Sequence, residues 1–96
     1  MSVTQARQSS ALALDQPWRL NPQVALRDES FGALAYHYGN RRLVFLKSRL
    51  LVELVSALAE YDTAADAIAA IVPEEQRSAY GRALLRLADS EVIGAR

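Results

Sequence analysis

The stretch that decides the fold is FGALAYHYGNRRLVFLK, from Phe31 to Lys47. Two runs rich in Tyr, Leu, Val and Phe flank Gly39-Asn40, a pattern typical of a β-hairpin. Glycine in the first loop position accepts the positive φ of a type II′ turn, and this turn matches the twist of paired strands. A two-residue loop places Tyr36 opposite Leu43, and the remaining pairs follow from that register.

Side chains alternate along each strand, so the hairpin has two faces. One face carries Leu34, Tyr36, Leu43 and Phe45, and the other carries Ala33, Ala35, Val44 and Leu46 with His37 and Arg42. Because neither face is strongly polar, we expect the rest of the fold to cover both in part. We expect His37 to be a surface or half-buried polar residue, not a general base.

The segments around the hairpin have their own periodicities. A short strand is expected over residues 24–27, and helices over residues 48–61, 63–71 and 73–89. Ser48 and Thr63 are typical N-caps, and Pro73 is typical of the first helical position. The predicted fold is α+β, a three-stranded antiparallel sheet followed by three helices, of the winged helix-turn-helix kind. Residues 1–16 are expected to be a flexible tail, and residues 17–96 a single domain.

Composition argues against catalysis. The chain has no cysteine, one histidine and four isolated glycines, so it offers no thiolate site, acid–base pair or phosphate loop. We therefore expect no enzyme activity, metal or cofactor. No stretch approaches the roughly 20 apolar residues of a membrane span, and the N-terminus lacks the pattern of a signal peptide. The expected location is the cytoplasm.

The charges are balanced overall but unevenly distributed. Eleven basic residues match eleven acidic ones, with net +3 over residues 1–48 and net −3 over residues 49–96. A neutral chain is a poor candidate for binding nucleic acid, which depends on neutralising phosphates. A winged-helix DNA-binding regulator is the alternative interpretation, but it requires a basic third helix. Here three arginines are offset by the four acids Glu74, Glu75, Asp89 and Glu91.

Two features favour a binding role. The strand after the hairpin loop has an edge with free N–H and C=O groups, which either the helices cover or a partner peptide extends. From the residues alone, the covered edge is the favoured interpretation. In the third helix, Gly81 is either tolerated, or lets a neighbouring helix approach, or forms a groove floor with Leu85 and Ala88 as lining and Arg77 at the rim.

Three segments carry a family resemblance: WRLNPQVALR at residues 18–27, FGALAYHYG at 31–39 and RRLVFLKS at 41–48. They closely resemble the mycofactocin biosynthesis peptide chaperones, which belong with the PqqD-like recognition elements of ribosomally made, modified peptides. The resemblance covers about residues 17–94. The hairpin segment is specific to the mycofactocin group, whereas the helical part matches the broader PqqD-like pattern only loosely.

The resemblance implies a peptide chaperone. In that interpretation the leader of a precursor peptide pairs with the third strand, in a cleft facing the third helix, and is delivered to a radical SAM maturase. The implied peptide-binding residues are Arg42, Leu43, Val44, Phe45, Leu46 and Lys47 on the strand, and Arg77, Tyr80, Gly81, Leu84, Leu85 and Ala88 on the helix. Proline at Val44 or Leu46 is expected to delete a strand donor and so to weaken peptide binding.

Overall fold

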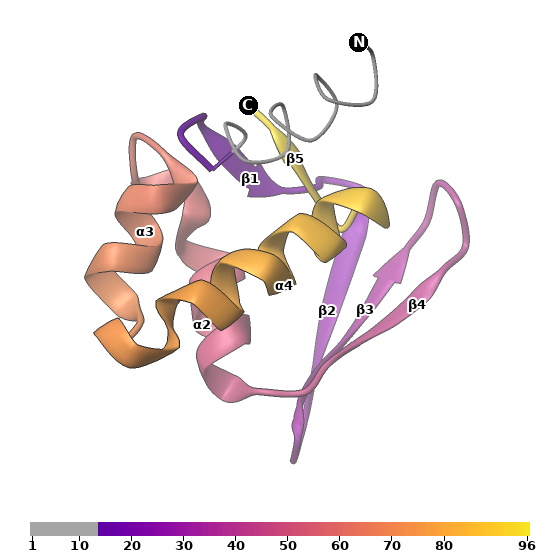
Figure 1. The fold of residues 1–96 in the computed structure, drawn as a ribbon. Coiled ribbons are helices and arrows are strands. Elements are labelled where there is room, and N and C mark those ends of the chain that lie inside the picture. The colour runs from indigo at the N-terminus through magenta and orange to yellow at the C-terminus, as the bar shows by residue number, and fades with distance from the viewer. Residues whose placement is uncertain (1–13) are drawn as a thin grey trace, which may run out of the picture.

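The computed structural model describes residues 14–96, which form two small sheets and three α-helices (Figure 1). In chain order the elements are β1 (Trp18–Leu20), β2 (Val24–Glu29), β3 (Gly32–His37), β4 (Leu43–Leu46), α2 (Arg49–Ala57), η1 (Leu58–Glu60), α3 (Ala64–Ile71), η2 (Glu74–Gln76), α4 (Arg77–Asp89) and β5 (Ile93–Ala95). The α+β class is confirmed, with a three-stranded antiparallel sheet and three helices after it. The likeness to a winged helix stays a prediction.

The larger sheet has the order β2-β3-β4, with every neighbouring pair antiparallel. The predicted hairpin register is confirmed, because Tyr36 pairs with Leu43 and Leu34 pairs with Phe45. β3 is the central strand. Among residues 14–96, β4 therefore pairs with a strand on one side only.

The hairpin loop differs from the expected type II′ turn, and that prediction is wrong. The loop spans residues 38–41: the N–H of Arg41 donates to the carbonyl of His37 at 2.8 Å, and the N–H of His37 donates to the carbonyl of Arg42 at 3.0 Å. The positive φ belongs to Arg41, at 64°, and not to Gly39. Lengthening the loop by one residue on each side leaves the strand register unchanged.

Short polar side chains cap the starts of α2 and α3. The Ser48 hydroxyl accepts from the N–H of Leu51 at 3.1 Å, and the Thr63 hydroxyl accepts from the N–H of Asp66 at 3.0 Å. Both predicted caps are confirmed. Pro73 is not the first residue of an α-helix, since it precedes the 3₁₀ turn η2 and α4 begins at Arg77.

The core lies between the helices and one face of the larger sheet. Ala33 and Ala35 of β3 are fully buried there, together with Leu46 of β4. Gly32 begins β3 with a φ of 150°, and a Cβ at this position would lie 2.1 Å from the carbonyl oxygen of Leu46. Only glycine lets β3 and β4 approach this closely.

The opposite face of the sheet, which we call the outer face, is open. It carries Phe31, Leu34, Tyr36, Leu43 and Phe45, and both β4 residues among them are 57% exposed. The expectation of partial cover is confirmed for Leu34 and Tyr36, which are half-buried, and is wrong for Leu43 and Phe45. The helices pack on the other side of the sheet (Figure 1).

A second, two-stranded sheet, which the sequence pattern did not reveal, joins the two ends of the described chain. β1 pairs antiparallel with β5, with Trp18 opposite Ala95. The described part begins at Leu14, whose carbonyl accepts from the N–H of Ala65 at 2.7 Å, while the carbonyl of Gln16 accepts from Ala64 at 3.0 Å. Contacts with α3 thus begin before residue 17. The rest of the expected tail, residues 1–13, lies outside the described residues.

Candidate functional site

The free edge of β4 is the first component of the site. In an antiparallel pair, residues alternate between exchanging hydrogen bonds with the partner strand and pointing their backbone groups away from it. The bond from His37 to Arg42 at 3.0 Å makes this pair a bonded one. Val44 and Leu46 are then bonded to β3, whereas the N–H and C=O groups of Leu43 and Phe45 point outward. The edge therefore offers backbone hydrogen bonds at alternate residues.

This alternation corrects the expectation that proline at Val44 or Leu46 would delete an outward donor. The N–H groups of Val44 and Leu46 face β3, so proline there breaks the sheet itself. The outward donors belong to Leu43 and Phe45. The sequence pattern alone did not reveal which set points outward, because that depends on the hydrogen bond at the end of the loop.

Helix α4 is the second component, and hydrogen bonds hold it beside β4 at both ends of the strand. Beyond the last residue of β4, the Ser48 hydroxyl lies 2.7 Å from the Tyr80 hydroxyl. Before the first residue, the Asn40 side-chain amide donates to the carbonyl of Ser90 at 3.4 Å. Each end of β4 is thus followed or preceded by a contact with α4 or with its C-cap, Ser90 (Figure 1).

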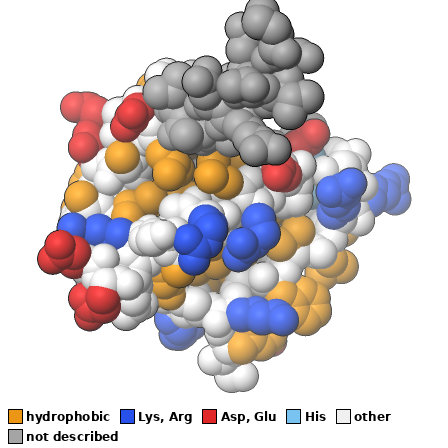
Figure 2. Space-filling model, in the orientation of Figure 1, with side chains coloured by type: hydrophobic (Ala, Val, Ile, Leu, Met, Phe, Trp, Pro, Cys, Tyr) orange, Lys and Arg blue, Asp and Glu red, His pale blue; other side chains and the backbone are white. Residues whose placement is uncertain are grey.

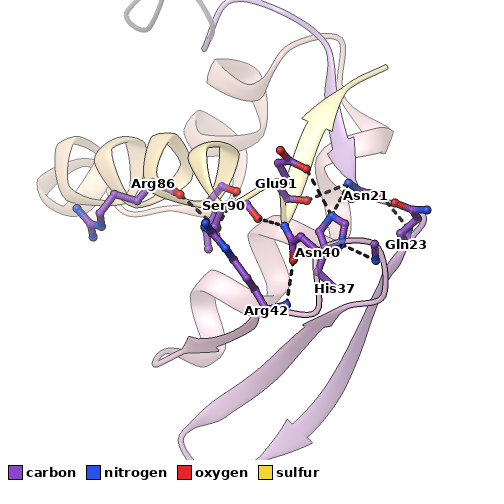
Figure 3. A network of polar contacts seen from close by, with 10 residues as sticks. Asn21, Gln23, His37, Asn40, Arg42, Arg86, Ser90 and Glu91 are labelled. Carbon is purple, nitrogen blue, oxygen red and sulfur yellow. Dashed lines mark hydrogen bonds and ion pairs between the residues drawn. The ribbon is translucent and has the colours of Figure 1, made fainter.

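The buried His37 organises the loop end of this arrangement (Figure 3). It is 3% exposed, so the expected surface or half-buried position is wrong. Its Nδ1 accepts from the N–H of Gly39 at 2.9 Å and from the N–H of Asn40 at 3.1 Å. Its Nε2 lies 3.3 Å from the Asn21 amide nitrogen and 3.9 Å from a Glu91 carboxylate oxygen. The histidine thus joins the hairpin loop to the turn after α4.

That turn has the hydrogen bonds of a Schellman motif. The N–H of Val92 donates to the carbonyl of Leu87 at 2.9 Å, and the N–H of Glu91 donates to the carbonyl of Ala88 at 3.0 Å. Glu91 occupies the left-handed position with a φ of 65°, where glycine is the usual residue. The Asn21 amide also donates to the carbonyl of Glu91 at 2.9 Å. The turn is therefore held by Asn21, which follows β1, as well as by the hairpin loop.

The structure separates the helix residues that the sequence analysis grouped as one wall. Tyr80 contacts Ser48 at the end of β4, and Leu84 lies in the core. Arg77, Gly81 and Leu85 instead line a groove of about 500 Å³ between α3 and α4. Within that groove a Cβ on Gly81 would lie 3.4 Å from Leu14 and 4.0 Å from Ile68. Ala88 is partly buried against the core.

The groove between α3 and α4 holds a structural arginine. The Arg77 Nε donates to the carbonyl of Val72 at 2.9 Å, and its Nη2 donates to the carbonyl of Ala69 at 3.1 Å. These are carbonyls at the C-terminal end of α3, which lack partners within the helix. Arg77 therefore ties the two helices together. This role differs from the rim charge that the sequence suggested.

The flank of α4 that faces β4 contains residues that the sequence analysis did not select. At 100° per residue, Ala83 and Leu87 lie on the same side of the helix as Tyr80. Ala83 is half-buried and Leu87 is 5% exposed. Helical spacing already groups Ala83 and Leu87 with Tyr80 in the sequence. Only the contact of Tyr80 with Ser48 shows that this side of the helix faces the end of the strand.

Basic side chains surround the edge of β4. Arg41 and Arg42 precede the strand and Lys47 follows it, and all three are exposed. Figure 2 shows further basic side chains across the middle of this face, where α4 lies, with acidic side chains at its left edge and above the basic ones. The arrangement therefore combines outward backbone donors and acceptors, a helix beside them and positive charge around them.

Comparison with known protein families gives the same assignment as the hairpin sequence. Residues 17–94 match the model of the peptide chaperone MftB family. The chain belongs to the peptide chaperone MftB family. The resemblance to mycofactocin chaperones is thereby confirmed, and the role that the family's name describes is not enzymatic.

Curated relatives in the MftB family match most of the chain. The peptide chaperone MftB of Mycolicibacterium smegmatis is 44% identical over 91 residues, which cover 94% of this chain and 89% of the relative. The peptide chaperone MftB of Mycobacterium tuberculosis is 44% identical over 86 residues, which cover 88% of this chain and 79% of the relative. No solved structure is significantly similar to the chain.

Two further observations on residues 14–96 bear on function. No group of three or more His, Asp or Glu side chains is arranged there to hold a metal ion. In the same range, no helix has the length and apolar character needed to cross a bilayer.

Proposed function

We propose that this chain binds the leader of a ribosomally made precursor peptide by strand addition at β4. It presents the bound peptide to a radical SAM maturase in mycofactocin biosynthesis, in the cytoplasm. The observation that supports this most strongly is the unpaired edge of β4, whose outward backbone groups belong to Leu43 and Phe45. Membership of a family named for peptide chaperones agrees with it.

The forces available at this edge are those of β-augmentation. Each backbone hydrogen bond between peptide and β4 contributes about 0.5–1.5 kcal/mol net, whatever the peptide sequence. Apolar peptide side chains that become buried add about 25 cal/mol per Å². Ordering a flexible peptide opposes both contributions, so we expect affinities in the nanomolar to micromolar range.

The charges around β4 favour a particular kind of leader. Arg41, Arg42 and Lys47 are exposed at the two ends of the strand. An acidic peptide gains attraction to these side chains during encounter, and its carboxylates help to fix the register. We expect such a peptide to bind more weakly as ionic strength rises.

The proposal is tested by titrating the isotope-labelled protein with a synthetic mycofactocin precursor leader and following NMR shifts. Phe45→Pro removes one outward N–H without breaking a bond to β3, as an edge strand permits. Phe45→Ala is the matched control, because it loses the same ring but keeps the N–H. We expect the proline variant to bind several-fold more weakly than the alanine variant.

Shifts in the wild-type titration should concentrate at β4 and at the flank of α4 that carries Tyr80. Equal leader affinity in folded Phe45→Pro and Phe45→Ala would rule out strand addition at this edge. Shifts confined to the groove between α3 and α4 would place the peptide elsewhere on the molecule.

A further inference from the structure

The outer face of the larger sheet is the most exposed apolar surface in the described part of the chain. Phe31 is 39% exposed, and Leu43 and Phe45 are each 57% exposed. The rings of Phe31 and Phe45 stack with centroids 5.7 Å apart, so they form one continuous surface. Contiguous exposed apolar side chains are typical of an interaction surface.

The position of this patch identifies its occupant. Leu43 and Phe45 have both their side chains on the outer face and their backbone groups at the free edge of β4. In an antiparallel sheet, directly opposite residues have side chains on the same face, with Cβ atoms about 4.5–5.5 Å apart. A strand added to β4 therefore places every second side chain beside Leu43 and Phe45. The patch is continuous with the edge at which the peptide binds.

The lining of the patch indicates which side chains fit. A groove of about 480 Å³ runs over the outer face, lined by Ala25, Arg27, Leu34, Tyr36 and Leu43. Arg27, the one charged residue among them, forms an ion pair with Glu29 at 2.9 Å. The Arg27 side chain is 75% exposed, and the other residues that line the groove are apolar or aromatic.

We propose that the outer face is a second contact surface for the same peptide, and that it selects apolar or aromatic residues at positions i and i+2. These two side chains lie beside Leu43 and Phe45, while residue i+1 points toward the side of the sheet where α4 lies. The inference rests on the proposed strand addition at β4. It adds a sequence requirement to a backbone interaction that by itself tolerates any sequence.

The test is a selection from a displayed library of short random peptides on the full chain. The same selection is run on Phe45→Ser and on Leu85→Ser, which alters a half-buried apolar residue in the groove between α3 and α4. We expect wild type and Leu85→Ser to enrich peptides with an apolar or aromatic pair at i and i+2. We expect Phe45→Ser to lose the preference at one position of the pair.

An enriched peptide then serves as the probe in a double-mutant cycle. Replacing its residue at i or i+2 with serine should weaken binding to the wild type about tenfold. At the position opposite Phe45, the same replacement should cost little on Phe45→Ser, because the two side chains contact each other.

Three results would overturn the inference. Enriched peptides that bind at β4, by NMR shifts, but lack the alternating pair would leave strand addition intact and remove the sequence requirement. A dimer in sedimentation that Phe45→Ser dissociates, with unchanged peptide preference, would assign the outer face to a second copy of the chain. A selection that enriches no peptide would count against the proposed function together with this inference.

Discussion

His37 shows how one buried side chain can organise the loop that precedes an exposed strand edge. Its Nδ1 accepts two backbone N–H groups of the hairpin loop, and the ring is buried between β3 and the turn after α4. The bond at the end of the loop determines which β4 residues bond to β3 and which point their backbone groups outward. By holding the loop, the histidine contributes indirectly to this alternation.

We expect His37→Phe to lower the free energy of unfolding by about 1–3 kcal/mol, since an apolar ring leaves the two N–H groups without their acceptor. His37→Asn is the matched variant, because its side-chain oxygen reaches the same two donors from a shorter stem. We expect His37→Asn to lower the free energy of unfolding by less than His37→Phe does. Urea denaturation measures the free energy of unfolding of each variant. Equal destabilisation by the two variants would contradict a role for Nδ1 as acceptor.

Arg77 gives the second prediction at the residue scale. Because its guanidinium donates to two carbonyls of α3, Arg77→Ala should destabilise the fold by about 1 kcal/mol. Arg77→Lys should recover only part of this, because a single ammonium lacks the fork geometry. Thermal unfolding measures the change. Leader affinity in the folded variant should stay the same, and a large loss of affinity would restore the binding role suggested by the sequence.

At the scale of the element, the alternation along β4 is the property that matters. Leu43 and Phe45 expose their amides at the edge, while Val44 and Leu46 bond to β3. Edge strands with apolar side chains are prone to association, so natural proteins usually cover or charge them. Here the basic residues at both ends of β4 provide charge, and no strand within residues 14–96 pairs with the edge itself.

We expect hydrogen exchange in the free protein to follow this alternation. The amides of Val44 and Leu46 should exchange slowly, and those of Leu43 and Phe45 quickly, because only the first pair is hydrogen-bonded within the sheet. Residue-resolved NMR exchange measures all four. Addition of the leader should slow the fast pair selectively. Uniform protection along β4 without peptide would mean that another segment already pairs with the edge.

At the scale of the whole molecule, β4 and α4 are neighbours because distant parts of the chain hold them. Ser48 and Tyr80 meet at one end of the strand, and Asn40 and Ser90 meet at the other. The sheet of β1 and β5 pairs the first strand of the described chain with the last, and the Arg96 side chain donates to the carbonyls of Ala59 and Tyr61. The position of α4 relative to β4 is thus a property of the assembled fold.

We expect Tyr80→Phe to lower the free energy of unfolding by about 0.5–1.5 kcal/mol, because it removes the hydroxyl that meets Ser48. If this contact sets the distance between β4 and α4, leader affinity should also fall. Calorimetric titration of the folded variant measures this. Tyr61→Phe is the matched control, because it removes the hydroxyl of a half-buried tyrosine away from the strand. Unchanged leader affinity in Tyr80→Phe would show that the core alone fixes the spacing.

The amino-acid sequence by itself determined the elements whose causes are local. The hairpin register follows from strand alternation around a central loop, and the two helix starts follow from Ser48 and Thr63, whose hydroxyls bond only a few residues along the chain. Family membership was likewise readable from the hairpin segment. Local hydrogen bonding and side-chain periodicity are both encoded within a few consecutive residues.

Only the tertiary structure decided which surfaces meet. It placed Arg77, Gly81 and Leu85 against α3, turned the flank of Tyr80 toward β4, buried His37 and left the outer face open. It also paired β1 with β5 from opposite ends of the described chain. The physical reason is that packing chooses among faces that have similar hydrophobicity in sequence. That choice depends on contacts between residues far apart along the chain.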